Sequence, residues 1–438
     1  MTTAPTTRLI PLPLSTGTVP DAVPVLSSFL AGDAAVFPLP DGPGAAARTR
    51  ATLTALMRPD EPAAPGTLIA CTSGSTGTPK GAVLRTPALD ASARATAELV
   101  ADRWGVSPGP WLLALPPHHI AGLQVILRSL HAGFTPHVTD PDLHGFTAAT
   151  RALRAAHPGE DLHTSLVPTQ LVRILRDPAA TAALREYASV LVGGAATPPD
   201  VLARCRDAGV HILLTYGSSE TSGGMVYDGR PLPGTSVTLE DPDAAGVGRV
   251  LLHGPTVAEG YRTVPAGPDD AFPRPGTFRT SDLGRIDDGV LTVLGRADGA
   301  VNTGGLKVLP EEVEAALAAA VPGATACALG VPDPEWGEAV VAVVATAPGA
   351  GVGVTGVDDD ATASAAGATA PGAAADPADP ATPVDVTPRL RALLHDAATP
   401  AHLIPRRVWR VPALPLTGPG KVDRVTVRRT VTALLDRG

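Results

Sequence analysis

The chain has 438 residues, more than a single hydrophobic core usually serves, so we expect one large domain and one smaller domain. The formal net charge is −9, but six Asp residues lie in the stretch from 349 to 388, which contains no Lys or Arg. The remaining sequence is nearly balanced in charge, which excludes bulk electrostatic attraction as a basis for binding nucleic acid or an anionic membrane.

The cysteines and the N-terminal sequence indicate the cellular compartment of the protein. Cys71, Cys205 and Cys327 are odd in number and far apart, without a C-x-x-C pair, which favours a reducing environment. The first residues, MTTAPTTRLIPLPLSTG, lack a basic region followed by an apolar run, and no apolar stretch approaches the roughly 20 residues that span a bilayer. The sequence therefore predicts a soluble, cytoplasmic protein.

Between Gly66 and Tyr261, short apolar runs alternate with segments rich in Ala, Arg and Leu. The runs are typical of buried parallel strands and cover residues 67–71, 111–115, 189–192 and 210–214. Two of the intervening segments, 87–104 and 199–207, are long enough for crossover helices. This alternation predicts a layered α/β domain, with its chemistry at the carboxyl ends of the strands, in loops 72–81, 193–197 and 216–220.

After Gly246 the pattern becomes shorter and more β-like, as in GRVLLHG and GVLTVLGR. Pro310, followed by two Glu residues, predicts the start of a helix, because Pro fits the first helical position. We expect a large α/β domain with a β-rich subdomain over 1–295, and a small α+β domain over 296–438. Residues 349–386 are rich in Ala, Gly, Pro, Thr and Asp and predict a flexible insertion, because they cannot bury enough apolar surface to fold.

The segment 72–81, TSGSTGTPKG, directly follows the first apolar run. It combines hydroxyl side chains, three glycines and Lys80 within ten residues. Glycines let backbone N–H groups approach an anion, hydroxyls add hydrogen bonds and a lysine adds a point charge, so the segment predicts a phosphate-binding loop. A flexible surface linker is the alternative. The segment is not a Walker A loop, because Gly81 follows Lys80 where Ser or Thr is required, which disfavours a kinase or GTPase.

This loop resembles the phosphate loop of the acyl-adenylate-forming enzymes, the superfamily of acyl-CoA ligases, peptide-synthetase adenylation domains and luciferases. Four further segments resemble motifs of that superfamily and occur in its order: 216–220 (YGSSE), 279–282 (RTSD), 295–299 (GRADG) and 418–424 (GPGKVDR). The sequence departs from the family at Ser219, where Thr is usual, at Ser281, where Gly is usual, and at Gly299, where a second hinge acid is usual. The resemblance implies an AMP-binding enzyme whose small domain rotates about a hinge.

The resemblance also implies residue roles. Lys421 would insert between the carboxylate and the α-phosphate, Ser219 would approach the α-phosphate, and Glu220 would hold Mg²⁺ together with Thr76. Asp282 would bind the ribose hydroxyls, and Asp298 would be the hinge pivot. The residues implied in nucleotide binding are Thr72, Ser73, Gly74, Ser75, Thr76, Gly77, Lys80, Gly194, Ala195, Thr215, Tyr216, Gly217, Asp282 and Arg296.

Each of these motifs also has a purely structural interpretation. The YGSSE segment alone would be a turn, Asp282 alone would be a turn former, and the segment 295–299 would be a β-hairpin. A lysine near a chain end, such as Lys421, is usually only solvated. Five segments that occur in family order favour the functional interpretation.

Four other segments indicate which acid the enzyme uses as its acyl substrate. They are 115–124 (LPPHHIAGLQ), 165–171, 190–198 and 215–234. They resemble the o-succinylbenzoate–CoA ligases of menaquinone biosynthesis, and among these the compact actinobacterial members. The resemblance implies an acyl pocket bordered by His119, Gly193, Gly223 and Gly224. The substrate has a second carboxylate, and which residue binds it is left open. The candidates are Ser165, Thr169, Gln170 and Arg128. His119 has a packed core histidine as its alternative interpretation, and His118 is interpreted as structural.

The implied reaction converts o-succinylbenzoate, ATP and coenzyme A into o-succinylbenzoyl-CoA, AMP and pyrophosphate through an acyl-adenylate. Adenylation gives a carboxylate a good leaving group, AMP, and it needs fixed donors, Mg²⁺ and a lysine to bring two anions together. The alternatives are a related aryl or short-acyl CoA ligase, an enzyme that loads a carrier protein, and a non-catalytic acyl or nucleotide sensor. The oligomeric state, including a homodimer, stays open.

Overall fold

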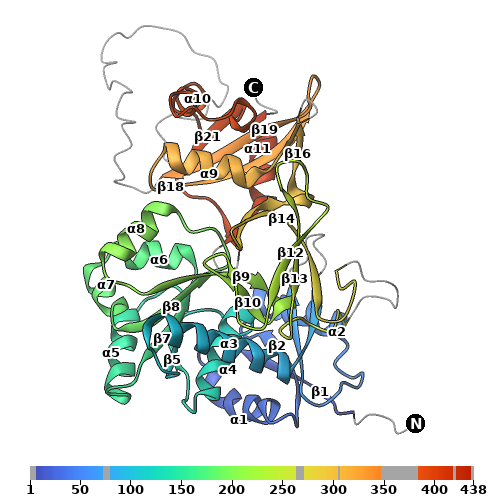
Figure 1. The fold of residues 1–438 in the computed structure, drawn as a ribbon, viewed down its shortest axis with the longest axis vertical. Helices are drawn as coiled ribbons and strands as arrows, with labels where there is room; N and C mark the ends of the chain where they lie inside the picture. Colours follow the sequence, from blue (N-terminus) through green and yellow to red (C-terminus); the bar gives the residue numbers. More distant parts are fainter. Residues whose placement is uncertain are drawn as a thin grey trace, which may run out of the picture. The chain divides into compact units, whose positions relative to one another are not determined.

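The computed structural model describes residues 6–72, 79–262, 271–303, 306–346, 383–417 and 421–435. The chain divides into two compact units, of which the first ends at Val293 and the second begins at Leu294. Both units combine helices with sheets (Figure 1). The mixed α/β class that the sequence predicts is therefore confirmed, whereas the domain boundary at residue 295 and the rotation of the small domain stay predictions.

The first unit begins with a four-stranded sheet in the order β1–β2–β3–β4, in which β1 to β3 are parallel and β4 is antiparallel to β3. The four strands are Leu9–Leu14, Ala35–Pro40, Thr67–Thr72 and Lys80–Arg85. Helices α1 (Val19–Leu30) and α2 (Ala45–Met57) lie between them in sequence. The sequence pattern predicts no element before residue 66, because runs such as IPLPL contain prolines. Proline fits β1 because β1 is an edge strand.

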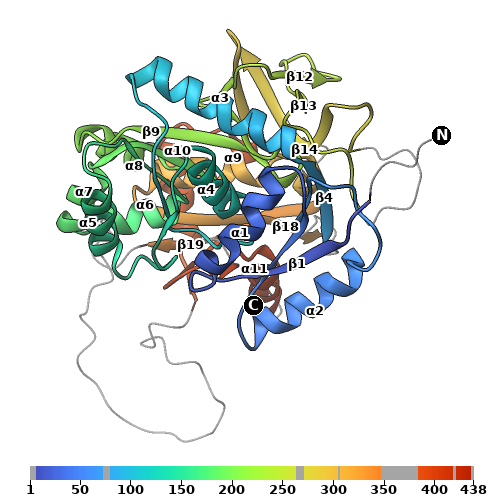
Figure 2. The same ribbon diagram turned by 90° about the horizontal axis from the view of Figure 1, so that it is seen from below.

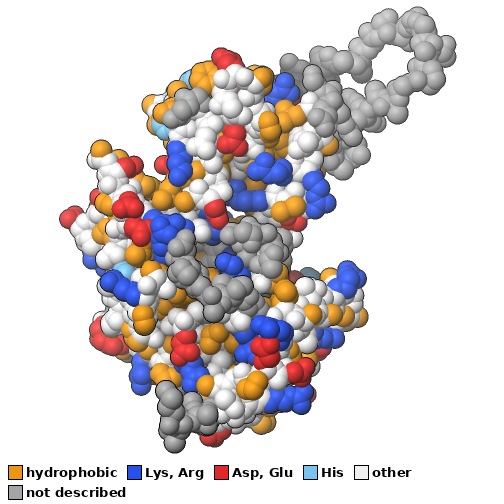
Figure 3. Space-filling model, turned by 90° about the vertical axis from the view of Figure 1, so that its right-hand side faces the viewer, with side chains coloured by type: hydrophobic (Ala, Val, Ile, Leu, Met, Phe, Trp, Pro, Cys, Tyr) orange, Lys and Arg blue, Asp and Glu red, His pale blue; other side chains and the backbone are white. Residues whose placement is uncertain are grey.

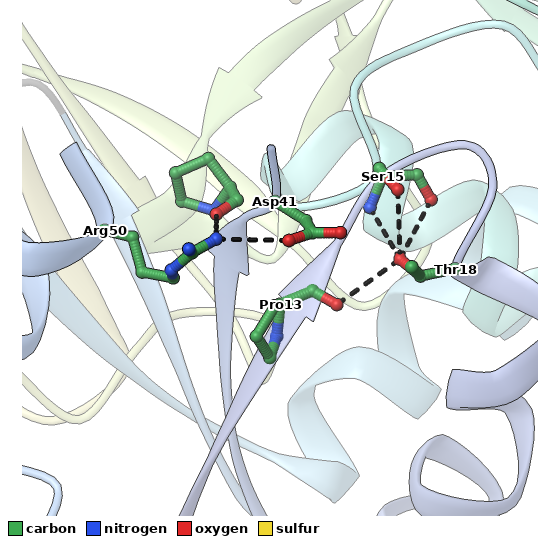
Figure 4. A network of polar contacts seen from close by, with 6 residues as sticks. Pro13, Ser15, Thr18, Asp41 and Arg50 are labelled. Carbon is green, nitrogen blue, oxygen red and sulfur yellow. Dashed lines mark hydrogen bonds and ion pairs between the residues drawn. The ribbon is translucent and has the colours of Figure 1, made fainter. Parts of the chain in front are cut away.

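Side-chain hydrogen bonds fix the carboxyl ends of β1 and β2 (Figure 4). Thr18 Oγ1 accepts a hydrogen bond of 2.8 Å from the Ser15 N–H in the turn before α1. Arg50 Nη1, on α2, donates to the Pro40 carbonyl and to Asp41 Oδ1, each at 3.1 Å. These bonds hold the chain in place where it leaves each strand.

The hairpin of β3 and β4 brackets the predicted phosphate loop. Its register pairs Cys71 with Gly81 and Thr72 with Lys80, while residues 73–78 lie outside the described residues. A Cβ at Gly81 would lie 2.4 Å from Met57 Sδ, on α2. Glycine there lets Met57 of α2 pack directly on the hairpin. The loop joins two antiparallel strands, and the sequence analysis had not predicted the second of them.

The second sheet of this unit has the order β11–β10–β9–β8–β7–β5–β6. Strands β9, β8, β7, β5 and β6 are parallel, and β10 runs antiparallel to both of its neighbours, β9 and β11. From β5 to β11 the bounds are Trp111–Leu113, His137–Val138, Leu162–Leu166, Tyr187–Gly193, Ile212–Ser218, Gly223–Tyr227 and Arg230–Pro231. The predicted runs at 111–115, 189–192 and 210–214 correspond to β5, β8 and β9. Strand β9 continues beyond its predicted end at 214, so it contains the first three residues of the YGSSE segment.

Helices cover both faces of this sheet (Figures 1 and 2). On one face Leu113 and Leu191 pack in a core with α3 (Thr86–Trp104) and α4 (Ile120–His131). On the other face their neighbours Leu112 and Val190 pack in a second core with α5 to α8. The bounds of these four helices are Phe146–Ala156, Pro168–Ile174, Pro178–Leu184 and Pro199–Asp207. The helices predicted at 87–104 and 199–207 are thus confirmed as α3 and α8.

A third sheet, in the order β12–β13–β14–β15, matches the β-like pattern predicted after Gly246. Its strands are Ser236–Glu240, Gly248–His253, Thr277–Asp287 and Val290–Arg296. The pairs β12–β13 and β13–β14 are antiparallel. Strand β14 carries the RTSD segment, so Asp282 lies within a strand and not in a turn.

The second unit has a mixed sheet with helices on both faces. Helices α9 (Pro310–Ala320) and α10 (Thr387–Asp396) pack on one face, and α11 (Arg424–Leu435) packs on the other. The strands β16 to β21 are Val301–Thr303, Leu306–Val308, Ala324–Asp333, Gly337–Thr346, Val384–Asp385 and Arg407–Val411. A separate hairpin consists of β22 (Leu416–Thr417) and β23 (Lys421–Val422). The helix predicted to start at Pro310 is confirmed as α9.

The predicted flexible insertion, 349–386, lies largely outside the described residues. Of its described residues, Val384 and Asp385 form β20 and pair with β21, and the flexible insertion stays a prediction. In the part of the chain that is described, no helix has both the length and the apolar character to cross a bilayer. On the face shown in Figure 3, Lys and Arg side chains are interspersed with Asp and Glu side chains.

His163, on β7, provides a test of the packing of the seven-stranded sheet in the first unit. Its Nδ1 lies 2.8 Å from Ser189 Oγ and its Nε2 lies 3.0 Å from the Ser107 carbonyl. Burial lowers the pKa of His163 from 6.5 to about 4. Between these two pH values the unfolded chain binds a proton that the folded chain does not bind, so stability falls as the pH falls.

We expect acidification from pH 6.5 to pH 4 to lower the unfolding free energy of the native chain. The decrease should be about 3 kcal/mol larger than the decrease in the variant His163→Asn. Urea unfolding followed by circular dichroism at several pH values in this range measures both slopes. The variant keeps every other histidine, so the contributions of those histidines to the pH dependence cancel when the two slopes are compared. Equal slopes would contradict the assignment of His163 as a buried, neutral side chain.

Candidate active site

Three side chains from distant parts of the sequence meet beside the β3–β4 hairpin. Glu220 lies in the short helical turn η1 (Ser219–Thr221), which contacts both strands of the hairpin. Tyr261 forms an isolated β-bridge with Ala82 on β4. Its hydroxyl donates a hydrogen bond of 2.7 Å to Glu220 Oε1, and Lys80 Nζ lies 4.8 Å from the centroid of its ring. Tyr261 therefore connects the lysine of the predicted phosphate loop with the predicted metal-binding glutamate.

The Glu220 side chain is suited to a cation. Glu220 is only 6% exposed, and a buried carboxylate is costly unless it is paired or coordinates a metal. Within the described residues no three His, Cys, Asp or Glu side chains gather as a metal site, and Thr76 lies outside them. Mg²⁺ commonly binds through one or two carboxylates together with substrate phosphates. Glu220 therefore fits a Mg²⁺ ion that arrives with a nucleotide.

A tight connection between β9 and β10 positions Glu220. Thr221 Oγ1 accepts a hydrogen bond of 3.0 Å from the Ser218 N–H and donates one of 2.8 Å to the Gly223 carbonyl. A Cβ at Gly217 would lie 2.1 Å from that same carbonyl oxygen. The backbone at Gly217 thus approaches the opposite strand so closely that only glycine fits. The glycine of the YGSSE segment therefore has a structural role whatever it contacts in a ligand.

Helices α3 and α4 hold this connection from the other side. The Ser222 carbonyl accepts hydrogen bonds from Gln124 Nε2 on α4, at 2.5 Å, and from Ser92 Oγ on α3, at 3.4 Å. Ser222 Oγ donates to the Thr256 carbonyl at 2.8 Å. Ser222 is fully buried and has a positive φ of 59°. Two side chains, from α3 and α4, and the backbone carbonyl of Thr256 therefore restrain the turn that presents Ser219 and Glu220.

The structure brings together two of the residues predicted to bind nucleotide. Tyr216, on β9, donates a hydrogen bond of 2.5 Å from its hydroxyl to Asp282 Oδ2, on β14. The Asp282 N–H donates to Thr280 Oγ1 at 3.0 Å. Asp282 is thus held both through its carboxylate, by Tyr216, and through its backbone N–H, by Thr280. Of the other predicted residues, Thr72 ends β3 opposite Lys80, and Gly194 and Ala195 are exposed just after β8.

Residues predicted to border the acyl pocket gather around the first turn of α4 and around Thr215. His119 is the N-cap residue of α4. The side chains of Ile120 and Gln124 lie 3.9 Å and 3.5 Å from the position of a Cβ at Gly223. A Cβ at Gly193 would lie 2.4 Å from Thr215 Oγ1, and one at Gly224 would lie 3.0 Å from Thr215 Cβ. The structure therefore places Gly193 and Gly224 on either side of Thr215.

His118 lies beside His119, just before α4. Burial, followed by the charge of His119, lowers the pKa of His118 from 6.5 to about 4. The two rings lie 4.3 Å apart between centroids. His118 is therefore neutral near pH 7, in keeping with a structural role.

One candidate for the second carboxylate, Gln170, is engaged within the fold. Gln170 Nε2 donates to the carbonyls of Ala114 and Pro141 at 2.6 Å and 2.7 Å, and its Oε1 accepts from the Val167 N–H at 3.0 Å. Gln170 therefore clamps two loops. Arg128 lies eight residues after Ile120 on α4, about 12 Å further along the helix axis. Ser165 is on β7 and Thr169 is on α6.

In the second unit, Lys421 is exposed and pairs with Thr417 in the β22–β23 hairpin. Arg424, three residues later, lies 2.8 Å from Glu314 Oε1 and 3.4 Å from Glu311 Oε1, both on α9. Burial raises the pKa of Glu314 from 4.5 to about 7, although Arg424 and the Ala328 N–H oppose this rise. These contacts anchor the segment that carries Lys421 to α9.

The predicted hinge residue has a partner in its own segment. Arg296 Nε lies 2.9 Å from Asp298 Oδ1, and Arg296 Nη2 lies 2.6 Å from Asp298 Oδ2. This is a two-bond arrangement of guanidinium and carboxylate, which fixes orientation as well as distance. The segment 295–299 contains the short helical turn η2 (Ala297–Gly299) and not the predicted β-hairpin.

Sequence reasoning missed Tyr261, Gln124, Ser222 and Ser92. Tyr261 follows a glycine outside any periodic run, and the other three lie at positions that a sequence pattern assigns to the core of a helix or turn. Their hydrogen bonds cross between elements that are far apart in the chain, so no local spacing could reveal them.

The sequence profile of a known family matches part of this chain. The family is described as AMP-binding enzyme, and the match covers residues 26–262, more than half of the chain. The chain therefore belongs to the AMP-binding enzyme family.

Individual named proteins are also similar to this chain. A probable 2-succinylbenzoate–CoA ligase of Mycobacterium tuberculosis is 48% identical over 283 residues, which cover 63% of this chain and 70% of that protein. The 2-succinylbenzoate–CoA ligase of Enterococcus faecalis is 30% identical over 293 residues, covering 62% and 58%. Among solved structures, o-succinylbenzoate CoA synthetase (MenE) from Bacillus subtilis in complex with the acyl-adenylate intermediate OSB-AMP has a TM-score of 0.62 and 23% identity, covering 82% of this chain and 68% of that one. This last likeness supports the fold.

The Tyr261 hydroxyl provides a test of the cluster. We expect Tyr261→Phe to lower the unfolding free energy by about 1.5–3 kcal/mol, because the variant leaves a buried carboxylate without its donor. Tyr187→Phe is a matched control, since it also removes a buried hydroxyl, whose partner is Thr150 Oγ1 at 2.8 Å. Thr150 keeps its hydrogen bond to the Phe146 carbonyl in that variant, so the control should lose about 0.5–1.5 kcal/mol.

Thermal and chemical unfolding of both variants measure these differences. A loss for Tyr261→Phe no larger than that for Tyr187→Phe would show that the hydrogen bond to Glu220 is not a significant restraint.

Proposed function

We propose that the chain is an ATP-dependent acid–thiol ligase that adenylates o-succinylbenzoate and transfers the acyl group to coenzyme A, releasing AMP and pyrophosphate. The observation that carries this proposal is the cluster of Lys80, Tyr261 and Glu220, which joins a phosphate-type loop to a buried carboxylate. The relatives that bear this activity in their names support the choice of substrate.

The nucleotide would bind along the carboxyl ends of β3, β8 and β9. Lys80 and the loop residues Thr72, Ser73, Gly74, Ser75, Thr76 and Gly77 would hold the phosphates, with Thr76 and Glu220 on Mg²⁺. Asp282, already oriented by Tyr216, would accept hydrogen bonds from the ribose hydroxyls. Around them we place the remaining residues, which are Gly194, Ala195, Thr215, Gly217 and Arg296.

The chemistry needs placement and charge stabilisation more than proton transfer. Attack of a carboxylate on the α-phosphate joins two anions, so the barrier falls when fixed positive groups meet the charge that grows at phosphorus. Bound Mg²⁺ would supply part of that charge. Ser219 would donate its hydroxyl to the α-phosphate, and Lys421 would lie between the carboxylate and the phosphate.

The acyl group would lie against His119, Gly193, Gly223 and Gly224. Glycine at residues 193 and 224 lets the backbone pack closely on Thr215, and a Cβ at Gly223 would come no nearer than 3.5 Å to Gln124. Lys421 is carried by the second unit, so rotation about Asp298 would bring it to the nucleotide and withdraw it for thioester formation. The anchoring of Arg424 to α9 would let Lys421 move with its unit as a rigid body.

Product analysis tests the activity. We expect incubation with ATP, Mg²⁺, coenzyme A and o-succinylbenzoate to yield AMP and the thioester, detected by mass spectrometry. Pyrophosphate exchange with a panel of acids distinguishes o-succinylbenzoate from other aryl and short acyl acids. Exchange without thioester formation would indicate a carrier protein as acceptor. Absence of ATP turnover with every acid would leave the sensor interpretation and overturn the proposal.

The role of Lys421 is tested by separating the two half-reactions. We expect Lys421→Ala to slow adenylation by on the order of 10²-fold or more, by analogy with other fixed charge stabilisers. Thioester formation from preformed adenylate should change far less. Arg429→Ala removes another exposed cation from the same unit and serves as the control. An unchanged adenylation rate in Lys421→Ala would refute the assignment.

A further inference from the structure

Arg424, the first residue of α11, bonds to both α9 and β18 in the second unit. Its Nη2 lies 2.8 Å from Glu314 Oε1 and 3.4 Å from Glu311 Oε1. Its Nη1 donates to the Ala328 carbonyl at 2.8 Å, and the Ala328 N–H donates to Glu314 Oε1 at 2.8 Å. Arg424 and Glu314 therefore hold both backbone groups of one residue of β18. Because the guanidinium is planar and meets several acceptors, its orientation is fixed as well as its distance.

Glu311 contacts a further segment through its second carboxylate oxygen. A Cβ at Gly295 would lie 2.4 Å from Glu311 Oε2, so this oxygen lies against the backbone of the segment 295–299, which carries the proposed pivot Asp298. Among the described residues, Glu311 Oε2 is buried without a hydrogen-bond partner. A buried, unsatisfied carboxylate oxygen is costly, so Glu311 depends on the guanidinium that meets its other oxygen. One carboxylate therefore lies between the hinge segment and Arg424.

Lys421 lies in a hairpin that is too small to fix its own position. Strands β22 and β23 have two residues each, and they pair Thr417 with Lys421 and Leu416 with Val422. A two-stranded hairpin is marginally stable at best when it stands alone. The orientation of Lys421 therefore depends on the elements that adjoin the hairpin.

Asp423 joins this hairpin directly to α11. Its N–H donates to the Pro415 carbonyl at 2.8 Å. Its Oδ1 accepts from the N–H groups of Val425 and Thr426, each at 3.1 Å, at the start of the helix. Because the hairpin passes into α11 without a flexible linker, a side chain that fixes the first residue of α11 also fixes the hairpin. Arg424 is that residue.

We infer that Arg424 is a positioning residue for Lys421, and that Glu311 extends its hold to the hinge segment 295–299. All of these residues belong to the second unit, so the contacts keep Lys421 in one orientation relative to Asp298 while that unit rotates. The inference rests on the proposed function, in which Lys421 serves adenylation. Arg424 acts through Lys421, so its loss should slow adenylation and leave thioester formation from preformed adenylate nearly unchanged.

The variant Arg424→Met removes the guanidinium and keeps an apolar stem. Arg428→Met is the matched control, because Arg428 lies one turn later on α11 and donates to the Gly330 carbonyl of β18 at 2.8 Å. At pH 8 Glu314 is ionised, since burial raises its pKa to about 7. At this pH we expect Arg424→Met to lower the kcat of adenylation by about 10-fold, the equivalent of one charged hydrogen bond.

The KM for ATP should change little in Arg424→Met, because the contact is not one that binds the nucleotide. Arg424→Lys should restore part of the rate, and Arg428→Met should keep the native rate. In the Lys421→Ala background, Arg424→Met should cause no further loss, since no lysine is left to position. An additional loss of about 10-fold in that background, or equal losses in both half-reactions, would indicate a general structural role and overturn the inference.

Hydrogen exchange tests the same contacts without any substrate. Mass spectrometry should show exchange about 10-fold faster in Arg424→Met than in the native chain, both in peptides that contain Asp423 and in peptides that cover 295–299. Arg428→Met should exchange at native rates in both. Native exchange in Arg424→Met would overturn the inference alone, whatever the native chain adenylates. Faster exchange in a chain that adenylates no acid would overturn the proposed function, and with it the role of Arg424 in adenylation.

Discussion

A carboxylate buried at the end of a strand is the constraint around which the candidate site is built. Glu220 is removed from water, so its charge must be met by a donor and by a cation within reach. The Tyr261 hydroxyl meets the first need, and the Tyr261 ring lies under the ammonium of Lys80. A site of this kind is incomplete without a cationic ligand. That incompleteness suits an enzyme whose metal enters with its substrate.

The surrounding fold keeps this carboxylate in one place. The YGSSE segment starts inside β9 and reverses direction through η1, where the close approach of Gly217 to the Gly223 carbonyl leaves one possible path for the backbone. Buried donors from α3 and α4 then hold the Ser222 carbonyl. The helices that cover one face of the parallel sheet therefore also restrain the loop at its carboxyl edge. Packing and site geometry depend on the same contacts.

Much of this arrangement could be predicted from the sequence, for identifiable reasons. Helices α3, α8 and α9 have Pro near their first residue and periodic apolar positions, strand β5 is an apolar run, and strand β8 contains the apolar run 190–192. The order of the motifs predicted the family. The elements before residue 66 could not be predicted, since prolines hide the alternation of β1. Contacts such as the one between Tyr261 and Glu220 depend on tertiary structure, which no local spacing encodes.

The two glycines after Ser222, which border the proposed acyl pocket, limit how freely its wall could be redesigned. A Cβ at Gly224 would lie 2.9 Å from Tyr227 Cε1 and 3.0 Å from Thr215 Cβ, while Gly223 adopts a φ of 93° that side chains rarely tolerate. Directed evolution toward a bulkier wall here would meet strong epistasis. A side chain at residue 224 would become acceptable only after residues 215 and 227 had been made smaller, so single-site libraries at this position should yield few folded members.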